Sequence, residues 1–321
     1  MNIVQVGLGP LGQKCVRFAL EREGINIVAA VDPAPDKVGR DLGELCGVGK
    51  LGVVVSSDLE SAIANQQVDA AVLTTVSSVR KIESQIVQLA EAKLHIVSTC
   101  EELSHPWLTA PEAAGRIDAI CKKNGVACIG TGVNPGYLMD FLPVALTAVC
   151  QRVDKIRVTR IQDASVRRIP FQQKIGAGLT PEQFAEKVKA GTLRHVGLTE
   201  SMNMIASRMG WKLDKTTESL DPVIAGEEIT SGYTPIRPGM ARGVEQIGRG
   251  FVNGEEIITL EFRAAVGEPE SFDRVEITGE PNLQSTIAGG VNGDTATCAI
   301  TINALRSIIS AKHGLRTMTD L

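Results

Sequence analysis

Two adjacent acids, Glu101 and Glu102, directly follow the apolar run 95–99. A carboxylate that is shielded from water has a raised pKa, because burial disfavours its charged form. We expect Trp107 and Tyr137 to provide that shield, so that the carboxylate exchanges protons near neutral pH with an amine or a hydroxyl. The pair is therefore expected to contain a general acid/base, and at least one member is expected to cap the helix that follows. Strand alternation does not choose between them.

The stretch VGLGPLG, residues 6–12, has the residue types of a phosphate-binding turn. Gly7 permits a tight turn, Gly9 lets a pyrophosphate approach the backbone, and Gly12 lets a helix pack closely on a strand. Free N–H groups at the start of that helix face the phosphates. Asp32 stands twenty residues after Gly12, where an acid accepts a hydrogen bond from the adenosine ribose. The pattern predicts a bound dinucleotide rather than a glycine turn without a ligand.

The charges around Asp32 bear on which dinucleotide binds. An acid at this position favours NAD(H) and repels the 2′-phosphate of NADP(H), whereas Lys37 and Arg40 in the following loop have the charge to reach such a phosphate. We therefore expect NAD(H) as the cofactor and leave NADP(H) open. The cofactor-binding residues predicted in this part of the chain are Gly7, Gly9, Pro10, Leu11, Gly12, Asp32, Lys37 and Arg40.

Apolar runs in the first half have the length and composition of parallel strands that are buried on both faces. Segments of helical length and period, including 10–23 and 80–93, separate them. This alternation predicts an α/β fold with a Rossmann-type, doubly wound parallel sheet. The expected strands are 2–7, 25–32, 52–56, 69–75, 95–99 and 125–130.

Ligands of such a sheet lie at the carboxyl ends of the strands, so the residues that close the later strands are further candidates. Hydroxyl groups in TTVSS, residues 74–78, can bond a ribose, although such residues are equally common as helix caps. The loop GTGVNPGYLMD, residues 130–140, has side-chain and backbone groups that can hold a carboxamide ring. The predicted cofactor contacts from these strand ends are Thr74, Thr75, Ser77, Thr99, Cys100, Asn134, Pro135 and Gly136.

The second half alternates apolar and polar residues at 155–165, 254–266 and 274–281, as in an open sheet with one buried face. It is expected to be an α+β domain for substrate binding. Arg157, Arg160, Arg167 and Arg168 include candidates for binding a substrate carboxylate, although arginines on such a sheet are usually solvated. The predicted substrate pocket consists of Trp107, Tyr137, Phe171 and Arg168.

The composition favours a small-molecule role. The chain has 321 residues, 43% of them hydrophobic, and a formal net charge of −4 with scattered basic residues. This predicts two domains and argues against nucleic acid or a membrane surface as a partner. The seven cysteines show no CxxC spacing and lie mostly in apolar stretches, which indicates a reducing, cytoplasmic compartment and no metal site. Without a signal peptide or a run near the ~20 residues of a membrane helix, the protein is expected to be soluble.

Several stretches together carry a resemblance to a known family. Besides VGLGPLG and GTGVNPGYLMD, they are VDPAPDKVGRDLGEL (31–45), STCEELSHPW (98–107), DASVRRIPFQQKIGAG (163–178), GGVNGDTATCAITINAL (289–305) and GLRTMTDL (314–321). Over nearly its whole length the chain resembles the dihydrodipicolinate reductase-like superfamily. Within it, the chain is similar to the branch of 2,4-diaminopentanoate dehydrogenases and native NAD(P)-dependent amine dehydrogenases.

The resemblance implies a catalytic glutamate in the CEEL stretch, a nicotinamide contact from the GVNPG loop and a homodimer built through the second domain. It also implies that the apolar helix expected at 294–310 returns to the first domain. We accordingly expect a dinucleotide-binding Rossmann domain at 1–136, a substrate and dimerisation domain at 137–284, and a C-terminal segment at 285–321 that packs back on the Rossmann domain.

Two departures from the motifs of related families narrow the predicted function. Dihydrodipicolinate reductases proper carry paired histidines with a nearby lysine, whereas His95, His105, His195 and His313 are widely spaced. Homoserine dehydrogenases and sugar oxidoreductases of similar build use a lysine just after the fifth strand, where this chain has two glutamates. A glutamate there suits activation of ammonia or deprotonation of a carbinolamine.

The predicted function is NAD(P)H-dependent reductive amination of small aldehydes or ketones with ammonia, and the reverse oxidative deamination of primary amines. One alternative is a diamino acid dehydrogenase, such as a 2,4-diaminopentanoate dehydrogenase, in which an arginine binds a carboxylate. A second is a non-catalytic dinucleotide-sensing protein, against which the paired acids argue.

Overall fold

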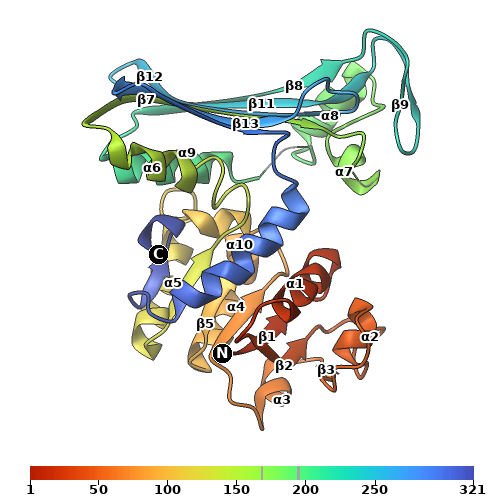
Figure 1. The fold of residues 1–321 in the computed structure, drawn as a ribbon, viewed down its shortest axis with the longest axis vertical. Helices are drawn as coiled ribbons and strands as arrows, with labels where there is room; N and C mark the ends of the chain where they lie inside the picture. Colours follow the sequence, from red (N-terminus) through yellow and green to blue (C-terminus); the bar gives the residue numbers. More distant parts are fainter. Residues whose placement is uncertain (168, 194–195) are drawn as a thin grey trace. The chain divides into compact units, whose positions relative to one another are not determined.

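The computed structural model describes residues 1–167, 169–193 and 196–321, so the predicted pocket residue Arg168 lies outside the described part of the chain. The chain forms two compact units (Figure 1). The first contains Met1–Tyr137 together with Asn292–Leu321, and the second contains Leu138–Val291. The predicted functional boundaries, 137–284 and 285–321, stay predictions.

The first unit is built on a seven-stranded sheet in the order β15-β6-β5-β4-β1-β2-β3. All its strand pairs are parallel, which confirms the predicted doubly wound sheet. The order reverses between β1 and β4, where dinucleotides bind in such folds. The strands are β1 Asn2–Val6, β2 Asn26–Val31, β3 Val55–Ser56, β4 Ala70–Leu73, β5 His95–Ser98, β6 Ala127–Gly130 and β15 Gly314–Arg316.

Helices cover both faces of this sheet because alternate strand residues point to opposite sides. Ala71 and Leu73 pack in one apolar cluster with α4 and α5. Ala70 and Val72, from the same strand, pack in another cluster with α1 and α10. The helices are α1 Pro10–Leu20, α2 Leu42–Cys46, α3 Leu59–Ile63, α4 Val79–Glu91, α5 Pro111–Asn124 and α10 Gly293–Ile308, with the 3₁₀ turns η1 Glu101–Ser104 and η3 Met318–Asp320.

Local sequence signals explain where several helices begin and end. The Asp41 carboxylate accepts from two N–H groups of α2, and Asp58 accepts from Ser61 N–H at the start of α3, which satisfies N–H groups that a helix leaves unpaired. Helix α5 begins with Pro111 and ends at Gly125, which has a left-handed φ of 71°. The edge strand β15 was not predicted, because it is too short to show a strand pattern.

The second unit has a six-stranded mixed sheet in the order β14-β13-β7-β12-β11-β8. Among the described strands of this sheet, β7 and β12 pair in parallel and the other neighbours pair antiparallel, which confirms the predicted open mixed sheet. Helices α6 and α9 lie along one face of it (Figure 1). The strands are β7 Arg152–Asp163, β8 Lys215–Ile224, β9 Ile229–Thr230, β10 Pro235–Ile236, β11 Ala241–Val252, β12 Glu255–Ala265, β13 Phe272–Glu280 and β14 Leu283–Ala288. The helices are α6 Phe141–Leu146, α7 Ile169–Lys174, α8 Pro181–Lys189 and α9 Leu198–Met209, with the 3₁₀ turn η2 Thr147–Val149.

A buried ion pair lies within this second sheet. Arg160 on β7 and Asp273 on β13 approach to 3.6 Å, and each side chain is 3% exposed. Burial lowers the pKa of Arg160 to about 10 and raises the pKa of Asp273. The prediction that these arginines are solvated is therefore wrong for Arg160, whereas the half-exposed Arg157 pairs with Glu261.

The ion pair also fixes the last residue of the second unit. Arg160 Nη2 and Gln162 Nε2 each donate to the Val291 carbonyl at 2.9 Å. The Val291 N–H donates to Asp273 Oδ2 at 2.7 Å. The charged pair thus holds both polar groups of the residue at which the chain leaves the second unit.

Replacing one member of this pair tests its contribution. Arg160→Met is expected to lower the free energy of unfolding by about 3–5 kcal/mol, because Asp273 would remain buried without its partner. The double variant Arg160→Met, Asp273→Leu should recover much of that loss, since no uncompensated charge remains. Urea unfolding of the three chains measures both effects, and a single-variant loss below about 1 kcal/mol, typical of an exposed pair, would contradict this account.

Candidate active site

The glycine turn after β1 leaves no room for side chains at two of its three glycines. Gly7 has a φ of 88°, and a Cβ added to it would lie 2.8 Å from the Thr74 carbonyl oxygen. A Cβ on Gly12 would lie 2.1 Å from the Gly7 carbonyl oxygen. A Cβ on Gly9 would have no neighbour within 4 Å, so the backbone there faces open space. The three glycines meet the distinct requirements of a phosphate-binding turn.

Helix α1 offers hydrogen-bond donors at its start. Gly9 is its N-cap and Pro10 its first residue, and the N–H groups of Leu11 and Gly12 fall in the first turn, where helical partners are missing. The helix dipole adds partial positive charge at the same end. These groups fit a pyrophosphate.

Asp32, which directly follows β2, is held by three donors. Its carboxylate accepts from Leu8 N–H at 2.7 Å, from Ala34 N–H at 3.0 Å and from Lys37 Nζ at 2.8 Å. Burial raises the pKa of Asp32, but the hydrogen bonds from Lys37 and from the two backbone N–H groups outweigh it and hold the pKa below its ordinary value. Asp32 is therefore ionised, and its charge is already paired with Lys37. Arg40 is exposed.

The residues after β4 support the glycine turn. Thr74 Oγ1 donates to the Gly7 carbonyl at 2.8 Å and accepts from Gln5 Nε2 at 2.8 Å. Its hydroxyl hydrogen is thus used within the protein, so Thr74 has fewer hydrogen-bonding groups left for the ribose contact that we predicted. Thr75 Oγ1 donates to Gln85 at 2.6 Å, and Ser77 is exposed.

The two acids after β5 have different environments. The Glu102 carboxylate accepts from the N–H of Val79, the first residue of α4, at 2.9 Å, where the N-cap Ser78 makes no side-chain bond. Glu102 therefore caps α4, the helix that precedes β5, and not the helix that follows it as predicted. Glu101 is half-buried, and no hydrogen bond or ion pair from the described residues engages its carboxylate.

Three interactions fix the turn η1 that carries these acids. Ser104 Oγ donates to the Glu101 carbonyl at 2.8 Å, and Glu102 N–H donates to the Ser77 carbonyl at 3.3 Å. A Cβ on Gly130, at the end of β6, would lie 2.6 Å from the Leu103 carbonyl carbon, so the missing side chain of Gly130 lets the turn pack on β6.

Thr99 and Cys100 link β5 to this turn. Thr99 is half-buried, whereas Cys100 is 1% exposed. Burial, assisted by the neighbouring carboxylates, raises the pKa of the Cys100 thiol to about 12. Cys100 is therefore a neutral packing residue next to the site.

The predicted pocket residues are distributed over both units. Trp107 packs on the apolar cluster under α4 and α5, and its ring lies edge-on to that of His105 at 5.1 Å. Tyr137 is half-buried at the end of the first segment of unit one. Phe171 belongs to the second unit, where the Arg167 guanidinium carbon lies 4.0 Å from its ring centroid.

Helix α10 holds the loop that we predicted to contact the nicotinamide. Val133 N–H donates to Thr297 Oγ1 at 3.2 Å, and Lys14 of α1 donates to Thr295 at 2.9 Å. The loop is tight, since a Cβ on Gly136 would lie 2.4 Å from Gly132 N. The predicted contacts Asn134 and Pro135 are both buried within it. Sequence reasoning missed the supporting roles of Gln5, Gly130 and Thr297.

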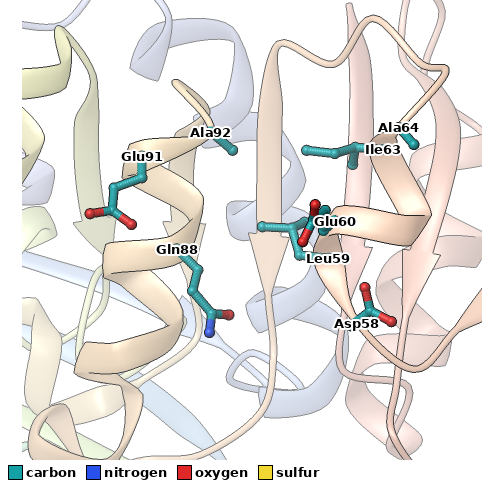
Figure 2. A pocket seen from close by; sticks show the side chains of 8 residues that line it. All are labelled: Asp58, Leu59, Glu60, Ile63, Ala64, Gln88, Glu91 and Ala92. Atoms are coloured by element: carbon teal, nitrogen blue, oxygen red, sulfur yellow. The ribbon is translucent and has the colours of Figure 1, made fainter.

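A separate open cavity of about 680 Å³ lies between α3 and α4 and contains none of the predicted site residues (Figure 2). One of its acids, Asp58, caps α3. In the part of the chain that the structure describes, no three His, Cys, Asp or Glu side chains are placed to hold a metal. None of the described helices is long and apolar enough to cross a membrane.

Two known families match different parts of the chain. Residues 137–321 match the family described as the 2,4-diaminopentanoate dehydrogenase C-terminal domain. Residues 1–101 match the family described as the dihydrodipicolinate reductase N-terminus.

Individual relatives match over the whole chain. A 2,4-diaminopentanoate dehydrogenase from Acetoanaerobium sticklandii is 33% identical over 100% of this chain and 93% of its own. An amine dehydrogenase from Streptomyces virginiae is 24% identical over 100% of this chain and 96% of its own. The solved structure of an amine dehydrogenase from Mycobacterium smegmatis matches with a TM-score of 0.85 at 26% identity, covering 100% of this chain and 96% of that one.

The buried His105, which directly follows η1, predicts that the stability of the fold depends on pH. His105 is 7% exposed, and burial lowers its pKa, as it does for His95. The folded chain therefore takes up these protons at lower pH than the unfolded chain, whose histidines titrate near about 6.5. The free energy of unfolding should fall as the pH drops below about 6.5, and His105→Gln should reduce that slope. Urea unfolding between pH 7.5 and 5.5 measures it, and an unchanged slope in the variant would exclude His105 as a cause.

Proposed function

The chain belongs to the 2,4-diaminopentanoate dehydrogenase family, and on that basis we propose that it is an NAD(P)H-dependent amine dehydrogenase. Its substrates are small aldehydes or ketones with ammonia, and primary amines in the reverse direction. Whole-chain similarity to two named amine-oxidising enzymes and to a solved amine dehydrogenase supports this assignment.

The first unit fits a dinucleotide. The open backbone at Gly9 and the first-turn N–H groups of Leu11 and Gly12 would hold the pyrophosphate. Asp32 would accept from the adenosine ribose, and the loop at Asn134–Gly136 would contact the nicotinamide. When bound, the reduced nicotinamide supplies a hydride to the substrate.

Glu101 carries the proposal. It follows β5 at the carboxyl edge of the sheet. Strand β5 lies next to β4, which itself lies next to β1 and the glycine turn. Because Glu102 is occupied with capping α4, Glu101 is the acid that remains available to exchange protons. We therefore assign Glu101 as the general acid/base and Glu102 as the residue that positions the turn.

The reaction needs one group that accepts a proton and later donates it. The Glu101 carboxylate accepts a proton from ammonium, and the ammonia so formed adds to the carbonyl carbon. A proton passes from the added nitrogen to the carbonyl oxygen, which gives the carbinolamine. Glu101 then donates its proton to the carbinolamine hydroxyl group, which leaves as water and gives an iminium ion. The carboxylate, again ionised, stabilises the positive charge of the iminium until its carbon is reduced.

The cofactor preference follows from the pairing of Asp32. A 2′-phosphate would face an ionised carboxylate, and Lys37 would reach that phosphate only by leaving Asp32, to which it donates at 2.8 Å. NAD(H) is therefore the preferred cofactor of this proposal, and NADP(H) binds more weakly.

The diamino acid alternative needs a cation for the substrate carboxylate. Arg157 pairs with Glu261, Arg160 pairs with Asp273, and Arg167 packs on Phe171. A substrate carboxylate would have to displace partners that these three arginines already have, which favours carboxylate-free substrates. The fourth predicted candidate, Arg168, lies outside the described residues. The 33% identity to a 2,4-diaminopentanoate dehydrogenase supports this second candidate function, so the substrate panel below includes its substrates.

The proposal extends to assembly and location. A homodimer through the second unit agrees with its exposed sheet face, where charges pair across strands, as between Arg263 and Glu245 at 3.1 Å. The mostly buried free cysteines suit a reducing, cytoplasmic location.

Exchanging each glutamate separately tests the assignment. Glu101→Gln should lower kcat for reductive amination by about 10²–10⁴ and leave the Kd for NADH nearly unchanged, because only proton transfer is lost. Glu102→Gln is the matched control, since its amide oxygen still accepts from Val79 N–H, and its loss should be much smaller. Steady-state kinetics and NADH fluorescence titration measure both. Full activity of the Glu101 variant would overturn the assignment.

A substrate panel distinguishes the candidate functions. We expect ammonia-dependent oxidation of NADH with cyclohexanone or isobutyraldehyde, and a slower reaction with NADPH. Activity confined to a 2-oxo acid or 2-amino-4-oxopentanoate would establish the diamino acid alternative. Tight NADH binding with no oxidation of the cofactor by any member of the panel would favour the dinucleotide-sensing protein.

A further inference from the structure

We propose that Gln5 and Thr74 are positioning residues that fix the peptide between Gly7 and Leu8 and thereby aim the start of α1 at the cofactor pyrophosphate. This inference rests on the proposed function only in requiring that a dinucleotide binds. It assigns no role to these residues in the transfer of a proton or a hydride.

The Gly7 carbonyl and the Leu8 N–H belong to the same peptide group, and both of its polar ends are bound. Gln5 Nε2 donates to the Gly7 oxygen at 2.9 Å, and Thr74 Oγ1 donates to the same oxygen at 2.8 Å. The Leu8 N–H donates to Asp32 Oδ2 at 2.7 Å. Gln5 also donates to Thr74 Oγ1 at 2.8 Å, so the two side chains orient each other. Rotation of this peptide would break all three bonds to its polar ends.

The burial of Gln5 shows that these bonds are a specific requirement. Gln5 is 1% exposed in β1, next to the apolar Ile3, Val4 and Val6. Burying an amide costs free energy unless it is hydrogen-bonded, and an apolar side chain would satisfy a strand buried on both faces more simply. Apart from a long 3.5 Å contact with the Val6 carbonyl, the Gln5 amide donates only to the turn and to Thr74.

The fixed peptide sets the position of α1. A Cβ on Gly12 would lie 2.1 Å from the Gly7 oxygen and 2.7 Å from Thr74 Oγ1, so the helix packs directly on the groups that Gln5 and Thr74 hold. If the Gly7 carbonyl moved, the first-turn N–H groups of α1 would move with it. The predicted consequence is weaker pyrophosphate binding with unchanged chemistry.

The experiment uses the full chain with the variants Gln5→Leu and Thr74→Val. The probes are NADH and ADP-ribose, which shares the pyrophosphate but has no nicotinamide. We expect the Kd of both probes to rise by a similar factor of about ten, equivalent to about 1.4 kcal/mol. Thr74→Ser keeps the hydroxyl and should restore the affinity.

Thr301→Val is the control. Thr301 is buried in the same unit, and its hydroxyl donates to the Thr297 carbonyl at 2.7 Å within α10. This variant should lower the Tm without changing either Kd. If Gln5→Leu does not fold, the comparison of Thr74→Val with Thr74→Ser decides the question.

Lower Tm with unchanged Kd for both probes in the Gln5 and Thr74 variants would overturn the inference, since the pair would then only stabilise the fold. A wild-type chain that binds no dinucleotide would also overturn it. A wild-type chain that binds NADH but aminates no carbonyl would overturn the proposed function alone, because the affinity test does not need turnover.

Discussion

The close approach between α1 and the turn after β1 is possible only because Gly12 has no side chain. The space that a Cβ would need lies 2.1 Å from the Gly7 oxygen, far inside van der Waals contact. Any larger residue would push α1 away from the sheet and carry the first-turn N–H groups with it. Helix α10 would also be disturbed, because it packs on α1 in one apolar cluster and holds the loop at Val133 through Thr297. The phosphate-binding end and the nicotinamide loop of the proposed site therefore depend on one missing methyl group.

A second glycine has the same effect on the turn η1. Gly130 ends β6 and lets η1 approach, since a Cβ would lie 2.6 Å from the Leu103 carbonyl carbon. The position of Glu101 is thus set from the neighbouring strand and not only by its own segment. Glu102 fixes the other side by capping α4. These contacts fix the backbone that carries Glu101, so in the proposed function only its side chain would lose conformational entropy on meeting a substrate.

The sequence predicted those parts of the fold that depend on one segment at a time. Strands buried on both faces favour apolar residues at most positions, so five of the six predicted strands of the first sheet match the structure closely, whereas the run at 52–56 joins β2 only at Val55 and Ser56. Strand β15 has three residues and gains its place by pairing with β6, which no local pattern can show. The capping role of Glu102 depends on the N–H of Val79, and the burial of Arg160 is accompanied by that of Asp273, more than a hundred residues away. Such distant partners are set by tertiary packing and leave no signal at fixed spacing.

Asp32 connects the two halves of cofactor recognition. One of its oxygens accepts both from Leu8 N–H and from Lys37, so the same carboxylate that we propose to face the adenosine ribose also holds the peptide on which α1 packs. Its low pKa keeps it charged, and a neutral or shorter residue would release the turn at the same time as it removed the repulsion of a 2′-phosphate. In the proposed site, selection between NAD(H) and NADP(H) is therefore not an independent property of the loop after β2. It is coupled to the proposed pyrophosphate-binding geometry, because Asp32 and Thr74 both hold the peptide group between Gly7 and Leu8.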